Sequence, residues 1–241
     1  MWLIPLIVLI VTIVLVVVLV AVQKSIHDKG DYKDGGGKQF GGSENANFFT
    51  PDNDKAGIYG ERQVNYYLRP LLRADEYLLA NLLLPLKNGR KTEIDCVLLS
   101  RKGIFCIETK NWIGHISGSD EDEYWKQEYD DPSMTNRYHE NPVIQNEKHC
   151  TILERTLKNK YGVTNIVIFA NLEDGWRIDS EYAYTIEGFR RYYRSLDDEE
   201  LLEEEIAQIF DLLKPYIATS AQLEQYRKII KRERNQLDNK A

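Results

Sequence analysis

The chain has 241 residues, three cysteines and a formal net charge of −7. This length allows one good-sized domain with appendages, and an odd number of cysteines fits a reducing compartment better than a disulfide framework. The sequence contains no Gly-x-x-x-x-Gly-Lys-Ser/Thr loop, no Gly-x-Ser-x-Gly motif and no coherent Ser/His/Asp set. ATP hydrolysis and serine-esterase chemistry therefore gain no support.

The acidic balance counts against a nucleic-acid partner, but the acids are concentrated in two places. Residues 120–131 and 197–205 each contain seven acidic side chains, and the first stretch has one lysine. The rest of the chain has a positive net charge. A basic surface can therefore exist, although the sequence does not display one.

The N-terminal segment 2–22 has no charged side chain and is apolar apart from Pro5 and Thr12. At about 1.5 Å per residue, a helix of this length spans the roughly 30 Å hydrocarbon core of a bilayer. We predict a single transmembrane helix at 1–23, with a cleaved signal peptide as the alternative. Lysines follow the segment, so the positive-inside rule places the rest of the chain in the cytoplasm.

Residues 24–54 are rich in Gly, Lys, Asp, Asn and Ser, which predicts a flexible linker. A helix is predicted at 55–69, where apolar side chains gather on one side and Pro70 kinks or ends the helix. Glu61 lies one turn from the start. The helix dipole favours an acid there, and a role in a functional site is an equally open interpretation.

The apolar run 77–84 predicts a first strand, and the chain then turns into a hairpin. Residues 93–110 are two short apolar runs around Ser-Arg-Lys-Gly, a pattern typical of two antiparallel strands and a tight turn. These runs carry three charged side chains: Asp95, Glu108 and Lys110. Charges inside apolar strands are unfavourable unless they are paired or bind a metal.

The loop length of this hairpin decides which side chains share a face. A two-residue loop sets Asp95 opposite Glu108. The next pair on the same face is then Glu93 and Lys110. A three-residue loop with Gly103 in a left-handed conformation turns Asp95 to the other face, and a four-residue loop sets Asp95 opposite Lys110.

Two carboxylates about 5 Å apart on neighbouring strands repel each other unless a positive charge lies between them. Mg²⁺ prefers carboxylate oxygens and water, and a nearby lysine can orient or deprotonate the attacking water. The hairpin is therefore a candidate metal site. The alternative, which the spacing alone favours, is a structural hairpin in which Lys110 pairs with Glu108 or Asp95.

Beyond the hairpin, residues 111–118 and 124–128 predict two further edge strands. An Asn-Pro pair opens a helix predicted over 141–160. Gln145 lies in its first turn, where it either caps the helix end or positions water or phosphate. His149 follows one turn later and can face the same way, although a surface position is the favoured interpretation.

The remaining chain begins with a continuous apolar run at 164–170, which is typical of a central or parallel strand. A short strand near 182–185 and a helix follow. An acidic helix is predicted from Ser195 or Asp197, and Pro215 ends it. The last helix, 220–237, is basic; we expect it to pack on the domain, with contact to anionic lipid or nucleic acid as the alternative.

Four ordered blocks over roughly residues 56–170 resemble the NERD (nuclease-related) domain of the PD-(D/E)XK nuclease superfamily. The blocks are Gly57-Ile58-Tyr59-Gly60-Glu61, the stretch 93–110 with Asn111, Trp125, and Asn141-Pro142-Val143-Ile144-Gln145. The nominal Pro-Asp is Ile94-Asp95 here. The resemblance implies a metal-dependent nuclease core with Asp95 and Glu108 as metal ligands. It also implies that Lys110 is the catalytic lysine and Glu61 an additional metal or water contact.

These features predict an α/β fold with a restriction-endonuclease-like core, in which helices flank a central mixed β-sheet. An N-terminal transmembrane helix and a C-terminal helical appendage complete it. The expected domains are 1–23 as the transmembrane helix, 24–54 as the linker, 55–172 as the nuclease-related domain and 173–241 as a mostly helical extension.

The expected function is a membrane-anchored phosphodiesterase that acts on DNA or RNA with Mg²⁺ or Mn²⁺. The candidate site residues are Asp95, Glu108 and Lys110 in catalysis and Glu61, Glu93 and Gln145 in positioning substrate or water. One alternative is a catalytically inactive nuclease fold that serves as a membrane-bound platform for nucleic acid or protein. Another is an envelope scaffold that works through the C-terminal helix.

Overall fold

The computed structural model describes residues 38–40, 53–172, 175–198 and 200–238. The predicted transmembrane helix at 1–23 and most of the predicted linker lie outside these residues, so both stay predictions. Within the described ranges, no helix combines the length and the apolar composition that crossing a membrane requires.

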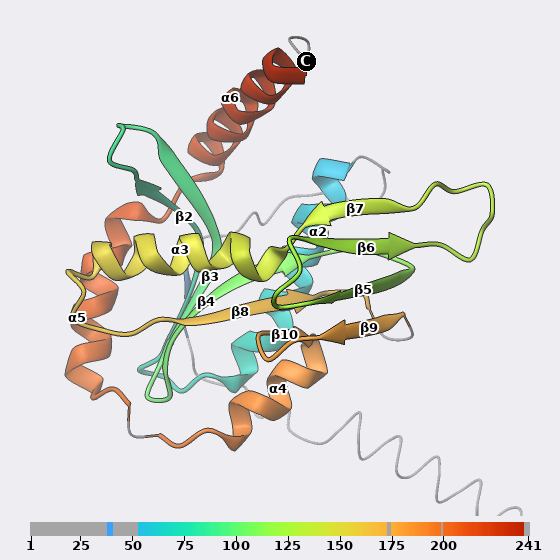
Figure 1. The fold of residues 1–241 in the computed structure, drawn as a ribbon. Helices are drawn as coiled ribbons and strands as arrows, with labels where there is room; N and C mark the ends of the chain where they lie inside the picture. Colours follow the sequence, from blue (N-terminus) through green and yellow to red (C-terminus); the bar gives the residue numbers. More distant parts are fainter. Residues whose placement is uncertain (1–37, 41–52, 173–174, 199, 239–241) are drawn as a thin grey trace, which may run out of the picture. The chain divides into compact units, whose positions relative to one another are not determined.

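A six-stranded mixed sheet forms the centre, in the order β1-β2-β3-β4-β8-β10 (Figure 1). Its strands are β1 (Lys38–Phe40), β2 (Tyr77–Pro85), β3 (Lys91–Ser100), β4 (Gly103–Lys110), β8 (Thr164–Phe169) and β10 (Ala183–Thr185). Strands β2, β3 and β4 are antiparallel neighbours, whereas β8 runs parallel to β4 and β10. The continuous apolar run of β8 is thus that of an internal parallel strand, which confirms the prediction.

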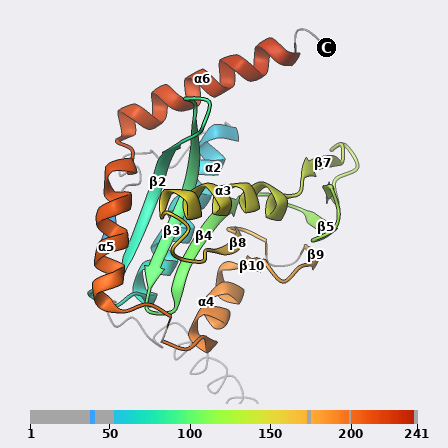
Figure 2. The same ribbon diagram turned by 60° about the vertical axis from the view of Figure 1, so that its left-hand side comes forward.

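Helices cover both faces of this sheet, which confirms the predicted α/β architecture (Figures 1 and 2). On one face pack α3 (Pro142–Thr156) and α5 (Glu203–Leu213), and on the other α2 (Asn53–Leu68) and α4 (Ile186–Ser195). Alternate strand residues meet the two layers. Val97 and Leu99 of β3 join the α3 and α5 cluster, while Cys96 and Leu98 join the α2 and α4 cluster.

A separate four-stranded sheet has the order β7-β6-β5-β9. Its strands are β5 (His115–Ser119), β6 (Tyr124–Glu128), β7 (Arg137–Glu140) and β9 (Trp176–Asp179). The predicted strands 111–118 and 124–128 correspond to β5 and β6, but β7 and β9 were not predicted. Trp125 is fully buried and stacks on Phe169 of β8, with 6.1 Å between the ring centroids. This contact packs the second sheet against the central one.

The chain after residue 172 contributes to both sheets before it becomes helical. Strand β9 pairs with β5 and β10 pairs with β8, so the first part of the predicted extension belongs to the sheets. The acidic helix begins at Glu203, and a start at Ser195 or Asp197 is wrong because α4 runs to Ser195. The long α6 (Ser220–Asp238) coincides with the predicted basic helix.

Three local features follow the sequence chemistry. Pro70 and Pro215 lie in the short 3-10 helices η1 (Arg69–Leu71) and η2 (Lys214–Tyr216), each of which directly follows an α-helix. Strand β1 lies within the predicted linker and pairs with β2. The three cysteines are free and buried, so they act as small apolar side chains.

Candidate active site

The hairpin of β3 and β4 creates a fork in the central sheet. Its loop has two residues, with Ser100 paired to Gly103, and Gly103 adopts a φ of 122° that favours glycine. The ladder between the two strands ends at the pair of Cys96 and Ile107. Beyond it, β3 stays with β2 while β4 stays with β8 as far as Lys110. The predicted carboxylates lie immediately beyond this point.

Asp95 lies in the fork, one residue beyond the ladder. Its Oδ2 accepts a hydrogen bond from the backbone N–H of Thr109 at 2.9 Å, which holds the side chain beside β4. Strand β2 is distorted at the same level, where Asn81 has a φ of 58°. Asparagine adopts this left-handed conformation more readily than most residues, so the sequence tolerates the distortion there.

The first of two side-chain clusters at the fork surrounds Glu108 on the α3 side. Lys110 Nζ donates to Glu108 Oε1 at 2.6 Å and to Gln145 Oε1 at 3.0 Å. Gln145 Nε2 donates to Glu108 Oε1 at 3.0 Å, and His149 Nδ1 lies 3.5 Å from Glu108 Oε2. We call Glu108, Lys110, Gln145 and His149 the lysine cluster. Burial alone would raise the pKa of Glu108, but Lys110 and His149 outweigh it and lower that pKa to about 2.

Helix α3 supplies two members of this cluster, Gln145 and His149, which lie four residues apart on one helix face. The expected surface position of His149 is wrong, because its side chain is only 12% exposed and faces Glu108. The helix starts where the Asn-Pro pair predicts, and the Asn141 side chain accepts the Val143 N–H at 2.9 Å. Buried Asn146 donates to a carbonyl of β4 at 2.8 Å and fixes α3 against that strand.

The second cluster, on the α2 side, contains three carboxylates and a guanidinium that contacts two of them. One carboxylate oxygen from each of Glu61, Glu93 and Asp95 lies within 4.8 Å of the other two. Arg227 of α6 donates to Glu93 from Nη2 at 2.5 Å and from Nε at 3.2 Å. Its Nη2 also lies 3.1 Å and 3.3 Å from the two oxygens of Glu61. We call Glu61, Glu93, Asp95 and Arg227 the arginine cluster.

Gly60 allows Glu61 to reach the fork. A Cβ at residue 60 would lie 2.8 Å from the Cβ of Asn111, closer than real Cβ atoms approach. Only glycine therefore lets α2 pass the end of β4 at this distance. The Asn111 side chain also donates to the carbonyl of Ala56 at 2.6 Å, which ties the first turns of α2 to the same strand end.

Negative charge exceeds positive charge in the arginine cluster. Burial raises the pKa of Asp95 well above its ordinary value, and the neighbouring Glu108, Glu61 and Glu93 raise it further. Burial also raises the pKa of Glu61, although Arg227 opposes the effect. The carboxylates of Glu93 and Glu61 in turn raise the pKa of Arg227, against the lowering effect of burial. One guanidinium thus pairs with two of the three partly buried carboxylates, Glu61 and Glu93.

The six predicted site residues all lie at the fork, but they do not form one set. Glu108, Lys110 and Gln145 contact one another, whereas Glu93 turns to Arg227 and does not share a partner with Lys110. For a two-residue loop, the sequence sets Asp95 opposite Glu108 and Glu93 opposite Lys110 on one face. Both pairings are wrong, because the strands separate beyond Cys96. Arg227 was missed as a site residue, since in the sequence it is one base among several in a basic helix.

Comparison with known proteins finds matches to the part of the chain that contains the fork. Residues 56–170 match the model of the NERD family, the nuclease-related domain. An uncharacterized protein of Bacillus anthracis is 29% identical over 113 residues, which cover 47% of this chain and 52% of that protein. The chain thus aligns with about half the length of this relative. No solved structure matches the chain.

The matched segment includes the whole lysine cluster and the three carboxylates of the arginine cluster, whereas Arg227 lies outside it. The fork is thus part of the matched core, and one of its charged partners comes from the following helical region. By this match, residues 56–170 are similar to the nuclease-related (NERD) domain.

Proposed function

We propose that this domain is a divalent-metal-dependent phosphodiesterase that acts on DNA or RNA. The observation that supports it most is the fork itself, where three carboxylate oxygens converge within 4.8 Å and a lysine cluster adjoins them. Mg²⁺ and Mn²⁺ prefer carboxylate oxygens, and hydrolysis of a phosphodiester needs positive charge beside the phosphate. The match to a nuclease-related domain agrees with this chemistry.

The donor set fits a hard divalent cation. We assign Asp95 as the central ligand because it neighbours both Glu108 and the pair of Glu61 and Glu93. Burial raises the pKa of Asp95 most, and the neighbouring carboxylates of Glu108, Glu61 and Glu93 raise it further, so a cation at this position would be favoured. A bound Mg²⁺ would offset this charge, polarise the phosphodiester and promote deprotonation of the attacking water.

Lys110 and Gln145 would act on the phosphate and the attacking water. The Lys110 ammonium is held between Glu108 and Gln145, so it presents a fixed positive charge at the fork. Such a preorganised charge stabilises the negative charge that develops on phosphate oxygens in the transition state. Gln145 accepts from Lys110 and donates to Glu108, and it thereby orients both groups.

The test uses the full chain with single- and double-stranded DNA and RNA, in Mg²⁺, Mn²⁺ and EDTA. We expect cleavage that requires the divalent cation and is lost in Asp95→Asn. Asp130→Asn is the matched control, because that exposed aspartate pairs with His115 in the second sheet, away from the fork. If the unaltered chain cuts none of these substrates even at a saturating concentration of either metal, the enzymatic proposal fails.

The second candidate is a nuclease fold that has become a binding platform for nucleic acid or protein. The net charge of −7 and the arginine that engages two of the carboxylates favour it. A platform does not require a metal, so calorimetric titration with Mn²⁺ separates the two candidates. Heat of binding that disappears in Asp95→Asn supports the enzyme, and its absence supports the platform.

We further propose that residues 2–22 anchor the chain in a membrane, with the nuclease-related domain in the cytoplasm. The uncharged apolar run and the lysines that follow it support this orientation. Protease digestion of intact cells, compared with permeabilised cells, tests it. Protection of the domain until permeabilisation is the expected result, whereas extraction of the chain by alkaline carbonate would contradict the anchor.

A further inference from the structure

We infer that α6 is an autoinhibitory latch, in which Arg227 takes the position of a divalent cation at the fork. The inference rests on the proposed function, because it concerns access of the metal to the same carboxylates. It assigns a regulatory role to a helix that lies outside the nuclease-related segment 56–170.

The contacts of Arg227 supply the first argument. Its guanidinium lies within hydrogen-bond distance of both oxygens of Glu61 and both oxygens of Glu93. In the part of the chain that the structure describes, these two and Asp95 are the three whose oxygens converge closely enough to hold a metal ion. A cation bound there needs oxygens that Arg227 already uses. A metal ion and a guanidinium on the same carboxylates would also repel each other. Arginine and metal therefore compete.

The attachment of α6 supplies the second argument. Among the described residues, none of the three apolar clusters of the domain includes a side chain of α6, and Leu223 is its one buried apolar residue. Two further contacts of the helix are polar: Tyr226 donates to the carbonyl of Lys91 at 3.4 Å, and Glu233 pairs with Arg90. Release of α6 would therefore leave the core of the domain intact.

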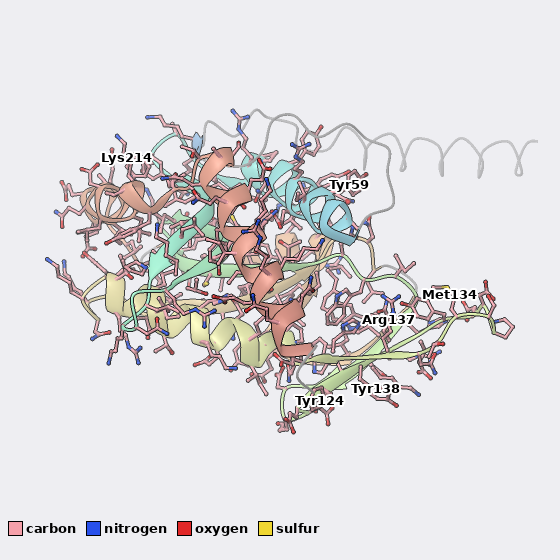
Figure 3. The ribbon with its side chains drawn as sticks, turned by 90° about the horizontal axis from the view of Figure 1, so that it is seen from above. Tyr59, Tyr124, Met134, Arg137, Tyr138 and Lys214 are labelled. Carbon is pink, nitrogen blue, oxygen red and sulfur yellow. The ribbon has the colours of Figure 1, made fainter. Side chains whose placement is uncertain are left out.

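The position of α6 fits a latch that swings from one end. Seen from above, the helix crosses the end of the sheet close to α2 (Figure 3). Just before α6, the Ala218 N–H donates to the carbonyl of Asn81 at 2.9 Å, and Ile217 bridges to Leu82. These backbone contacts hold the start of the helix on β2 while the rest can separate from the fork. Arg227 is then the main polar contact between the helix and the site.

Linkage between the two cations is reciprocal. If α6 weakens metal binding, then metal binding must weaken the docking of α6 by the same factor. A divalent ion brings twice the charge of the guanidinium to a cluster in which carboxylates outnumber cations, so it should displace Arg227 at sufficient concentration. The latch thus makes the nuclease-related domain responsive to divalent cations or to any partner that captures α6.

The test compares Mn²⁺ affinity by calorimetry in the full chain, in Arg227→Gln and in Arg227→Lys. We expect Arg227→Gln to bind Mn²⁺ about tenfold more tightly, and Arg227→Lys to fall between, because lysine keeps the charge but loses the bidentate contact. Lys228→Gln is the control, since Lys228 is exposed and pairs with Glu224 on its own helix. Its affinity should equal that of the unaltered chain.

A second readout follows α6 directly by amide hydrogen exchange. In the absence of metal, Arg227→Gln should exchange faster in α6 and not in β3 or β4, and Mn²⁺ should have the same effect on the unaltered chain. Unchanged exchange in both cases would overturn the latch, as would equal Mn²⁺ affinity in Arg227→Gln and the unaltered chain. Either result leaves the proposed function standing.

Two further outcomes separate the latch from the function. If no variant binds Mn²⁺ and none cuts nucleic acid, the proposed function fails and the latch fails with it. If Arg227→Gln loses cleavage at saturating Mg²⁺ without a change in Mn²⁺ affinity, Arg227 is a substrate contact and the latch is overturned. Faster cleavage by Arg227→Gln at low Mg²⁺ supports the latch.

Discussion

The two clusters at the fork use the same kinds of side chain but differ in how their charge is balanced. In the lysine cluster, Glu108 forms an ion pair with Lys110 of its own strand, and the pKa of Glu108 falls to about 2. In the arginine cluster, the pKa values of Glu61 and Asp95 rise, and the balancing charge comes from a helix outside the matched domain. Positive charge is therefore permanent on one side of the fork and removable on the other.

This difference assigns separate roles to the two sides. A carboxylate that keeps its cation in every state is suited to hold a catalytic lysine in one orientation. Carboxylates that share a removable cation are suited to exchange it for a metal ion. The comparison leads to three predictions, each of which concerns a substitution in or beside one of the two clusters.

The largest effect is expected from Lys110→Met, which removes the positive charge of the lysine cluster. Cleavage should fall by at least about 100-fold, since a positioned catalytic group contributes this much or more. Glu108 would remain buried without its main partner, and loss of one member of a buried ion pair costs roughly 3–5 kcal/mol of stability. Cleavage assays and urea unfolding measure both effects. Lys126→Met, in the pair with Glu128 on the second sheet, is the control; equal activity in the two variants would refute the role of Lys110.

An intermediate effect is expected from Gly60→Ala, which acts on the arginine cluster. The new methyl group would lie 2.8 Å from the Asn111 Cβ, so α2 must shift away from β4. Overpacking of this kind costs about 1–3 kcal/mol. Because Glu61 is the next residue, Mn²⁺ affinity should fall as well, while the pair of Lys110 and Glu108 persists. Gly57→Ala, at a position with open space, is the control; the same loss in both variants would contradict the explanation.

The smallest effect is on stability and comes from Asp95→Asn. The substitution removes an uncompensated charge and keeps an oxygen that can accept the Thr109 N–H. The metal-free protein should become more stable by about 1 kcal/mol, as often occurs when strain at a functional site is relieved. In saturating Mn²⁺ the order should reverse, because the variant loses the metal. Urea unfolding with and without Mn²⁺ measures the difference; a destabilised metal-free variant would contradict the prediction.

The pH dependence of stability sharpens the same prediction. The pKa of Asp95 is higher in the folded protein than the ordinary value of 3.8, so the folded state binds its proton more tightly. Its contribution to stability is present at low pH and is lost as the pH rises through the folded pKa. Glu108 has the opposite sign, and its contribution is lost as the pH falls from 4.5 toward about 2. Above pH 4.5, Asp95→Asn should therefore show a flatter stability profile than the unaltered chain.

Much of this architecture could be predicted from local sequence. The apolar runs and the Ser-Arg-Lys-Gly turn specify the hairpin of β3 and β4, and the Asn-Pro pair specifies the start of α3. The site residues on these elements follow, since period two and period 3.6 bring Glu108, Lys110 and Gln145 to one face. Only two strands of the second sheet, β5 and β6, were predicted, because β7 and β9 have only four residues each and no apolar alternation strong enough to identify them.

The division of the site into two clusters depends on tertiary structure that no local pattern contains. Pairing rules assume a continuous ladder, whereas the real ladder ends at Cys96, and this separates Glu93 from Lys110. Arg227 lies 134 residues from Glu93, and neither residue differs in type from many others in the chain. His149 was expected at the surface because a lone histidine without a second ligand at metal spacing has no local signal for a site.

A crystal structure of the full chain with Mn²⁺ tests the central claim most directly, because the anomalous signal locates the ion without assumptions about activity. We predict a peak about 2.1 Å from a carboxylate oxygen of Asp95, with Arg227 withdrawn from Glu93. A fork without a peak at saturating Mn²⁺, with Arg227 still bound to Glu61 and Glu93, would contradict the account.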